Sequence, residues 1–253
     1  MSNSGIYTNT FTHFYDLIYG DKDYAKESSF ILHSINLFHP HIQDVLELGC
    51  GTGNYTQYFL NEPWNMYALD ISPNMVEEFQ SKGITGVELI LEDLLKYQNP
   101  EKFDVILALF NVLGYLNSDL EVHKCFQNAF RNLKQNGLFY FDVWNKPGVH
   151  FHGFKTKVKK IENDDFIITR ISESEFNENR NLVKVDFNLF VEERKTGHIH
   201  KSNETHWIRP FEKDEIDFWA KENGLQILSY EESYTGEPIL ENTWLATYIL
   251  KKP

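Results

Sequence analysis

Cysteine is scarce in this chain, and that scarcity excludes a disulfide framework. The 253 residues include only two cysteines, Cys50 and Cys125. Two cysteines do not provide the paired spacing of a zinc site, and the histidines show no ligand spacing either. We therefore expect no metal. Cys125 falls on the apolar face of a predicted helix, which is typical of a small core residue.

Basic side chains are also few, which argues against a nucleic-acid partner. Lys and Arg number 24 against 37 Asp and Glu, which gives a net charge of −13. A surface this acidic repels phosphate backbones. The lysines between residues 155 and 160 alternate with Thr156 and Val158. That alternation is typical of the solvated face of a strand.

Long apolar runs and a targeting segment are missing as well. No stretch is long enough to span a membrane. The first residues, Met1–Tyr7, lack the charged and apolar regions of a secretory leader. We therefore expect a cytoplasmic protein without membrane contacts. Hydrophobic residues make up 42% of the chain and aromatic ones 15%, enough for one large domain with an insertion.

Glycines cluster at one place, between a predicted strand and a predicted helix. Val45–Leu48 is a short apolar run, Gly49–Gly53 is rich in glycine, and a helical pattern starts at Tyr55. A strand, a glycine turn and a helix bring main chain close to a nucleotide, because a Cβ would hold the backbone away. A dinucleotide fingerprint would need a third glycine where Asn54 stands, which disfavours a dehydrogenase.

Three landmarks together resemble the class I S-adenosylmethionine (SAM) methyltransferases. The run from Glu47 to Gly53 reads E-x-G-x-G-x-G, like the first motif of that family. Asp70 ends a predicted strand about 20 residues later, where a carboxylate accepts hydrogen bonds from ribose hydroxyls. The stretch 70–75 matches the family's D-x-S-x-x-M, and 92–94 matches its third landmark.

The resemblance implies SAM as cofactor and S-adenosylhomocysteine as product. It implies that the glycine turn wraps the amino-acid end of SAM and that Asp93 accepts from the adenine amino group. A "YD" segment at Tyr15, like that of many small-molecule methyltransferases, implies that the N-terminal helix covers the cofactor. The cofactor-binding residues implied in this way are Tyr15, Glu47, Gly49, Cys50, Gly51, Asp70, Ile71, Met75, Glu92, Asp93, Leu94 and Phe110.

Alternating strand and helix patterns predict an α/β fold with a Rossmann-like parallel sheet and helices on both faces. Expected strands are 45–48, 66–70, 87–91, 103–109 and 138–143, and expected helices are 7–19, 24–38, 54–61, 73–82 and 119–135, with Gly137 as a C-cap. Ligands then bind at the carboxyl ends of the strands.

The sequence pattern changes over residues 151–208 and predicts an inserted antiparallel meander. Its strands are expected at 166–172, 182–191 and 198–208, before a helix at 212–223 and strands at 225–230 and 244–250. We divide the chain into residues 1–150, the helical cap and SAM-binding core; 151–208, the insertion that shapes the acceptor site; and 209–253, the return to the core.

This arrangement is similar to the sugar-nucleotide N-methyltransferases, which methylate dTDP-linked aminosugars. That resemblance implies catalytic roles for Tyr7 and Tyr115, and substrate contacts for Trp144, His206 and Arg209. It implies a small-molecule acceptor, with the protein a monomer or homodimer. Tyr115 stands where some of these enzymes have a histidine, and the tail lacks their glycine-rich, arginine-bearing end, so the sugar class stays open.

The acceptor chemistry leaves alternatives open. An amine loses its proton near neutral pH, and Tyr115 or Asp142 would then only orient the ammonium. A hydroxyl acceptor needs a positioned base, for which His150, His152 and His206 are the candidates. A protein that binds SAM without turnover has the same landmarks and remains a further alternative.

Overall fold

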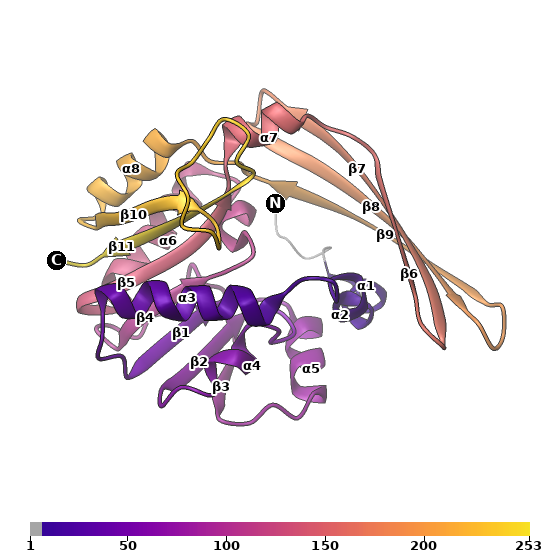
Figure 1. Ribbon diagram of the computed structural model, residues 1–253, viewed down its shortest axis with the longest axis horizontal. Coiled ribbons are helices and arrows are strands. Elements are labelled where there is room, and N and C mark those ends of the chain that lie inside the picture. Colours follow the sequence, from indigo (N-terminus) through magenta and orange to yellow (C-terminus); the bar gives the residue numbers. More distant parts are fainter. Residues whose placement is uncertain (1–6) are drawn as a thin grey trace.

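Seven strands form a mostly parallel sheet at the centre of the computed structural model, which describes residues 7–253 (Figure 1). The strands are β1 (Asp44–Leu48), β2 (Asn65–Asp70), β3 (Val87–Leu91), β4 (Phe103–Ala108), β5 (Leu133–Trp144), β10 (Gln226–Glu232) and β11 (Leu245–Lys251). Their order is β10-β11-β5-β4-β1-β2-β3, and β11 runs antiparallel to both of its neighbours. The predicted Rossmann-like sheet is therefore confirmed.

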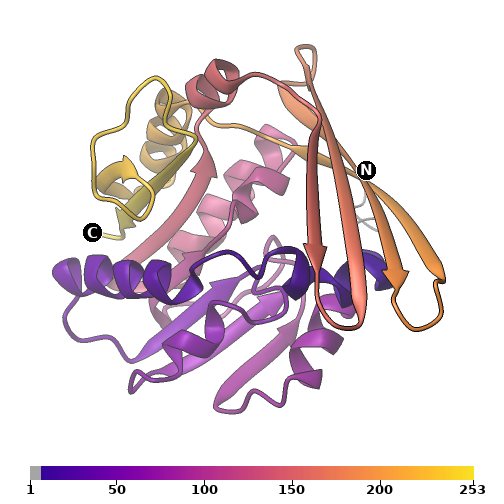
Figure 2. The same cartoon turned by 45° about the vertical axis from the view of Figure 1, so that its right-hand side comes forward.

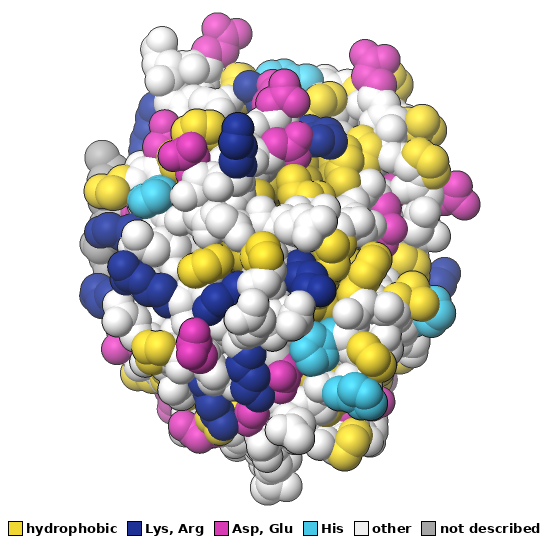
Figure 3. Space-filling model, turned by 90° about the vertical axis from the view of Figure 1, so that its left-hand side faces the viewer, with side chains coloured by type: hydrophobic (Ala, Val, Ile, Leu, Met, Phe, Trp, Pro, Cys, Tyr) yellow, Lys and Arg dark blue, Asp and Glu magenta, His cyan; other side chains and the backbone are white. Residues whose placement is uncertain are grey.

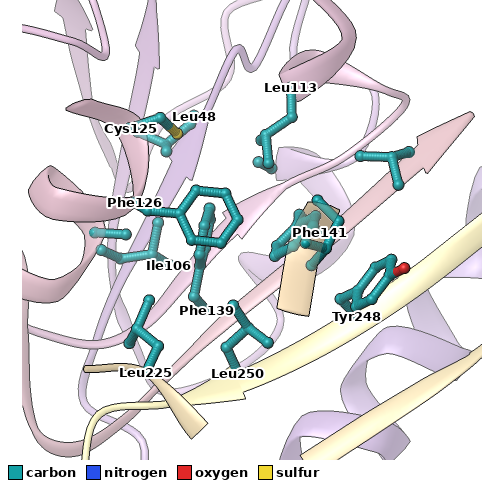
Figure 4. Close-up of a cluster of buried hydrophobic side chains, with 14 of the residues drawn as sticks. Leu48, Ile106, Leu113, Cys125, Phe126, Phe139, Phe141, Leu225, Tyr248 and Leu250 are labelled. Atoms are coloured by element: carbon teal, nitrogen blue, oxygen red, sulfur yellow. The ribbon is translucent and has the colours of Figure 1, made fainter. Parts of the chain in front are cut away.

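Helices cover both faces of this sheet, because successive buried residues of each strand point to opposite sides. On one face α3 (Tyr24–Phe38) and α4 (Thr56–Phe59) pack over Val45 and Val105. On the other, α6 (Asp119–Asn132) and α8 (Lys213–Glu222) pack over Leu46 and Ile106. Figure 4 shows this second cluster, in which the rings of Phe141 and Tyr248 stack with centroids 5.3 Å apart.

A second sheet of four antiparallel strands arises from the insertion. Its strands are β6 (Lys157–Glu162), β7 (Phe166–Asn177), β8 (Leu182–Glu193) and β9 (Ile199–Ile208), in that order. Figures 1 and 2 show it standing beside the core, next to the short helices α1 (Asn9–His13) and α2 (Tyr15–Ile18). Phe11 and Ile18 of these helices pack with Ile168 and Leu189 of the sheet. The N-terminal segment therefore lies between the two sheets.

Shorter elements complete the chain around the carboxyl ends of the central strands. These elements are α5 (Pro73–Ser81), η1 (Val112–Tyr115) and α7 (Lys146–His152). Ser72 caps α5 by accepting a hydrogen bond from the Met75 amide, and Pro73 takes the first helical position, as expected for that sequence.

Several boundaries differ from the sequence-based expectation, and two of the differences have a clear local cause. The helix predicted to reach residue 135 ends at Asn132, and Gly137 lies inside β5 rather than capping that helix. A Cβ on Gly137 would approach the Lys134 carbonyl oxygen to 2.9 Å, so close strand packing requires this glycine. The single N-terminal helix expected over 7–19 is divided at Phe14, whose φ of −98° and ψ of 5° leave the helical region.

The surface is mixed in charge on the face shown in Figure 3, where basic side chains lie next to acidic ones. Exposed apolar side chains such as Phe218 and Leu240 occur on this protein, as on most protein surfaces. Within residues 7–253, no helix is long and apolar enough to cross a membrane.

The amino ends of the central strands are joined by an ion cluster. Asp44 on β1 accepts from Lys102 at 2.7 Å and from Lys134 at 2.9 Å. Lys134 also contacts Asp104 on β4 at 2.9 Å, and Asp104 accepts from the Asp44 amide. Burial acts to raise the pKa of Asp44, but these lysines prevail and lower it to about 2. The cluster therefore stabilises the folded state through the ionised carboxylate.

Replacing Asp44 by Asn should lower the free energy of unfolding by about 2 kcal/mol at pH 7. The folded-state pKa lies below that of the unfolded chain, so this stabilisation is complete above about pH 5 and disappears as the pH falls toward about 2. Urea titrations of both proteins between pH 3 and 7 measure it. Asp217→Asn, which removes an exposed partner of Lys213, is the matched control and should change little. A difference independent of pH would contradict the assignment.

Candidate active site

The glycine turn follows β1, at the point where the order of the central sheet reverses. The chain passes from β1 to β2 and β3 on one side and to β4 and β5 on the other, which opens a crevice at their carboxyl ends. A Cβ on Gly49 would meet Val112 at 2.6 Å, and one on Gly53 would meet Phe79 at 2.4 Å. Gly51 has a φ of +55°, and nothing lies nearer to its Cβ position than the Met75 Sδ, at 4.0 Å. Gly51 therefore leaves room for a ligand.

Asp70 holds the glycine turn from the neighbouring strand. Its carboxylate accepts from the amides of Gly51 and Ser72, both at 2.8 Å, and burial raises its pKa. A carboxylate oxygen accepts more than one hydrogen bond. Each oxygen of Asp70 can therefore also accept from a ligand hydroxyl beside the turn.

Glu47 lies beneath the same turn rather than in the crevice. Its side chain is 2% exposed and accepts from the Thr56 hydroxyl at 2.6 Å. Burial raises its pKa to about 8, so the group is mostly protonated at neutral pH. The Cys50 amide donates to the Leu69 carbonyl at 3.0 Å. These contacts support the turn, and direct cofactor contacts of Glu47 and Cys50 stay predictions.

Apolar side chains flank the neighbouring part of the crevice. Ile71 and Leu91, at the ends of β2 and β3, are 57% and 53% exposed. Asp93 uses one oxygen to accept from the Leu95 amide at 2.9 Å, and Glu92 accepts from the Asp93 amide at 2.8 Å. Exposed apolar groups beside a carboxylate suit a flat heterocycle with an exocyclic amine. Two further predicted residues, Met75 and Leu94, pack against the protein core.

The turn after β4 is held by Asp142. Phe110 and Asn111 have φ values of 63° and 61°, an unusual left-handed pair. Both amides donate to the fully buried carboxylate of Asp142, and Tyr234 donates to it at 2.5 Å. Burial raises the pKa of Asp142. The expectation that Asp142 orients a substrate ammonium is therefore wrong: its carboxylate is enclosed and fixes the position of Phe110.

A chain of hydrogen bonds joins the predicted tyrosines to the inserted sheet. The Tyr7 and Tyr115 hydroxyls lie 2.7 Å apart, and the Tyr115 hydroxyl lies 2.9 Å from His206 Nδ1. His206 Nε2 is 3.0 Å from Glu204, which also accepts from the Tyr7 amide and from the amide and hydroxyl of Thr8. Tyr7, Tyr115 and His206, far apart in sequence, therefore form one connected group.

The charge of the Glu204 carboxylate determines which group donates in each hydrogen bond of this chain. Burial acts to raise the pKa of Glu204, but the hydrogen bonds from His206 and Thr8 prevail and hold it below its ordinary value. An ionised Glu204 requires a proton on His206 Nε2, so the Nδ1 of a neutral imidazole accepts from Tyr115. Tyr115 then accepts from Tyr7. Burial raises the pKa of both tyrosines, so both hydroxyls keep their protons.

Aromatic rings surround the open end of this chain. The Tyr7 ring lies 6.2 Å from that of Tyr15, and Tyr15 lies 4.7 Å from Tyr19. Tyr19 meets Phe110 edge-on at 5.3 Å. The four tyrosines Tyr7, Tyr15, Tyr19 and Tyr115 are only half-buried, so solvent reaches this wall. Such faces attract a nearby cation.

Sequence reasoning missed three charged residues at this site. Asp16 accepts from the side chains of Thr52 at 2.6 Å and Asn54 at 2.9 Å, and so ties α2 to the glycine turn. Lys22 Nζ contacts Glu27 at 2.6 Å and lies 4.8 Å from the centre of the Phe110 ring. The third is Glu204. Of the three, only Asp16 could have been found from the sequence, because it is the acidic residue of the "YD" segment.

Trp144 packs near this group, whereas the guanidinium of Arg209 points into a different space. The Trp144 ring lies 5.1 Å from Trp244, in a cluster that includes Tyr115. The Arg209 amide donates to Gly114 at 2.7 Å, but its guanidinium contacts Asp119 and Glu215. It lines a surface pocket of about 660 Å³ whose other lining residues include Lys146, Arg180, Phe218 and Trp219.

The other two histidine candidates lie apart from the hydrogen-bonded chain. His150 packs its ring against Phe176 at 4.6 Å, and His152 Nε2 lies 2.8 Å from the Asn242 carbonyl oxygen. Of the three histidines considered as bases, the structure therefore brings only His206 to the tyrosines.

Comparison with known proteins places this geometry in a family. Residues 45–137 match the family described as a methyltransferase domain. The chain is 24% identical over 215 residues to the dTDP-3-amino-3,4,6-trideoxy-alpha-D-glucopyranose N,N-dimethyltransferase of Streptomyces venezuelae. The aligned region covers 84% of this chain and 89% of that protein.

Solved structures resemble the whole chain. The crystal structure of a SAM-dependent methyltransferase from Clostridium acetobutylicum is 27% identical, with a TM-score of 0.80 over 96% of this chain and 98% of the other. An amino pentose methyltransferase from Micromonospora echinaspora, solved with SAM bound, has 17% identity and a TM-score of 0.77, with complete coverage of both chains. The inserted sheet is therefore part of a shared fold.

Replacing Glu204 by Gln should loosen residues 7–8, because a neutral amide accepts weakly where the carboxylate accepts four hydrogen bonds. We expect the free energy of unfolding to fall by about 1–3 kcal/mol and amide exchange at Tyr7 and Thr8 to rise at least tenfold. Hydrogen exchange with mass spectrometry measures this. Glu193→Gln, an exposed carboxylate on the same sheet, is the control. Equal exchange in both variants would contradict the role of Glu204.

The sequence landmarks, the open position at Gly51 and the carboxylate of Asp70 agree with these similarities. The matching domain covers the strands that build the crevice, and the relatives extend the agreement to the inserted sheet. The chain is therefore a class I SAM-dependent methyltransferase, similar over most of its length to enzymes named as sugar N-methyltransferases.

Proposed function

We propose that this enzyme transfers the methyl group of SAM to the amino group of a small molecule, with nucleotide-linked aminosugars as the acceptor class. The observation that carries the proposal is the hydrogen-bonded chain of Tyr7, Tyr115, His206 and Glu204, which ends in a half-buried tyrosine wall. The names of the relatives support the acceptor class, because one methylates a dTDP-linked aminosugar and another an amino pentose.

The crevice fits the cofactor by its own chemistry. Gly51 leaves space for the amino-acid end, Asp70 has acceptor capacity for the ribose, and Ile71 and Leu91 flank the place for the adenine. SAM supplies an activated methyl group on a cationic sulfur. The protein then needs to align donor and acceptor and to exclude water, and alignment alone supplies a large share of the rate. Tyr7 and Tyr15 would present ring faces and hydroxyls to that cation.

The tyrosine chain suits an amine acceptor. When Tyr115 donates to His206 and Tyr7 donates to Tyr115, the Tyr7 oxygen retains a free lone pair. An ammonium N–H can donate to that lone pair, which would orient the nitrogen toward the methyl group. Loss of the ammonium proton then occurs to solvent or along the chain to His206. Trp144 would bound the acceptor beside Tyr115.

O-methylation is a second candidate, favoured by the pair of His206 and Glu204. An imidazole backed by a carboxylate can take up a hydroxyl proton, which would reach buried His206 through Tyr7 and Tyr115. The nucleotide part of either acceptor would have room in the pocket beside Arg209, where Arg180 supplies positive charge and Trp219 a stacking surface, while Lys146 pairs with Glu212 at 3.1 Å.

Replacing Asp70 by Asn should weaken SAM binding at least tenfold, about 1.4 kcal/mol, because the amide offers one acceptor oxygen in place of two. Isothermal titration calorimetry measures the affinity, and a melting curve checks the fold. Glu77→Gln on the exposed side of α5 is the matched control. An unchanged dissociation constant would refute the ribose role of Asp70.

Replacing Tyr115 by Phe should lower kcat about tenfold at pH 7, with SAM affinity unchanged. For an amine acceptor the deficit should shrink toward pH 9, because more amine is already deprotonated in solution. For a hydroxyl acceptor it should persist at every pH. The measurement is transfer of labelled methyl from SAM to dTDP-linked aminosugars, their hydroxy counterparts and simple amines such as glycine.

Tyr58→Phe, on α4, is the control and should retain wild-type kcat. Label on hydroxy sugars alone would replace the N-methyl assignment by O-methylation. An enzyme that binds SAM but labels no member of the panel would overturn the proposed acceptor class. The alternative of a protein that binds without turnover would then gain support.

A further inference from the structure

The inner face of the inserted sheet contains a band of polar side chains. Directly paired residues of antiparallel strands lie on the same face and form rows across the sheet. In three adjacent rows across β7, β8 and β9, the residues on β7 and β9 are polar. They are the rows Arg170–Leu189–Ser202, Ser172–Phe187–Glu204 and Ser174–Val185–His206. The same face is apolar and buried at Ile168, Val183, Val191 and Ile208, and its β6 edge has Lys157 and Lys159, which pair with Ser172 and Arg170. Glu204 and His206 already belong to the site, whereas Arg170 and Ser172 have no assigned role.

Arg170 is only partly satisfied. Its Nε and Nη1 are shielded from solvent and have no hydrogen-bond partner in the part of the chain that the structure describes. The Ser172 hydroxyl, two positions along the same face of β7, is also buried without a partner. Unpaired buried polar groups cost about 1–3 kcal/mol each, and charged ones more, so proteins rarely keep them without a reason. The three atoms together point to a missing hydrogen-bond acceptor.

Nearby carboxylates do not supply it. Glu204, in the adjacent row, is occupied by four hydrogen bonds from Tyr7, Thr8 and His206. Asp21 pairs with Lys159, at 2.5 Å. Among residues 7–253, no carboxylate lies within salt-bridge distance of Arg170.

Two other cations beside the site, Lys22 and Arg209, are neutralised. Lys22 pairs with Glu27 at 2.6 Å, and Arg209 pairs with Asp119 and Glu215. Arg170 therefore differs from them, because its polar neighbour is the Tyr19 side chain and no described carboxylate lies within salt-bridge distance. On a chain with a net charge of −13, a partly buried guanidinium without a carboxylate partner is a strong local attraction for an anion.

Arg170 also lies at the tyrosine wall. Its guanidinium is 5.3 Å from the centre of the Tyr19 ring and 5.5 Å from that of Phe187. Tyr19 packs against Tyr15, and Phe187 lies 4.9 Å from His206. One aromatic ring on either side thus separates Arg170 from the groups assigned to SAM and to the acceptor.

We propose that Arg170 binds an oxyanion of the acceptor, a carboxylate or a phosphate, with the Ser172 hydroxyl as an additional donor. The planar guanidinium matches the paired oxygens of either group, and Nε with one terminal nitrogen forms the usual fork. This inference rests on the proposed amine methylation, and it adds that the methylated molecule has its amine and an anion on opposite sides of Phe187. A neutral amine would leave the guanidinium unpaired and should bind poorly.

The test measures binding of small probes to the protein saturated with S-adenosylhomocysteine, by calorimetry. Glycine against glycinamide tests a carboxylate, and glucosamine 1-phosphate against glucosamine tests a phosphate. We expect the anionic member of at least one pair to bind at least tenfold more tightly than its neutral partner. Arg170→Gln should abolish that preference, Arg170→Lys should retain part of it, and Ser172→Ala should reduce it a few-fold.

Arg194→Gln removes an arginine from the same sheet that is paired with Glu162, and it should keep the full preference. SAM affinity should be unchanged in every variant, which shows that the fold and the cofactor site persist. Equal binding of charged and neutral probes to the wild type would overturn the proposal, as would a preference that survives in Arg170→Gln.

Methyl transfer measured on the same probes separates this inference from the proposed function. Equal transfer to neutral and anionic amines by wild type and Arg170→Gln would retain N-methylation and remove the oxyanion site. An oxyanion preference that depends on Arg170, without transfer to any amine, would retain the site and remove the proposed reaction.

Discussion

The carboxylate of Glu204 is the contact on which the assembly of the site depends. It accepts hydrogen bonds from Tyr7, Thr8 and His206, and so it joins β9 to the segment that precedes α1. A buried carboxylate without such donors would be strongly unfavourable, so the N-terminal segment and the sheet stabilise each other. The same contact fixes the tautomer of His206 and, through Tyr115, the orientation of the hydroxyls at the wall.

Two other buried carboxylates, on the central sheet, also accept hydrogen bonds from backbone amides. Asp70 holds the amide of Gly51, and Asp142 holds the amides of Phe110 and Asn111 in a left-handed turn. Charge-assisted hydrogen bonds to backbone amides are stronger than neutral ones, which offsets the strain of these conformations. Because Glu204 and Asp142 are engaged in this way, the tyrosine wall presents rings and hydroxyls rather than carboxylates.

The two sheets contribute different parts of the candidate site. The carboxyl ends of β1, β2 and β4 provide the cofactor crevice, since that is where a doubly wound sheet opens. The inserted sheet supplies the polar band that faces α1 and α2, with Arg170 as its unpaired cation. On the proposed placement of the acceptor, its specificity would depend on the insertion, while the cofactor crevice would belong to the parallel core.

Sequence patterns alone are enough to predict the parallel core, the antiparallel insertion and the cofactor landmarks. Those features depend on local patterns: apolar runs, glycines next to a strand, and an acidic residue at a strand's end. The folded arrangement was needed to show that Tyr7, Tyr115 and His206 form one chain, that Glu204 anchors it and that Asp142 is enclosed. Glu204 stands in an unbroken run of polar residues, 200–206, on β9, and its partner Tyr7 is 197 positions away. Strand register and packing bring such residues together, and no local pattern specifies which distant side chains will meet.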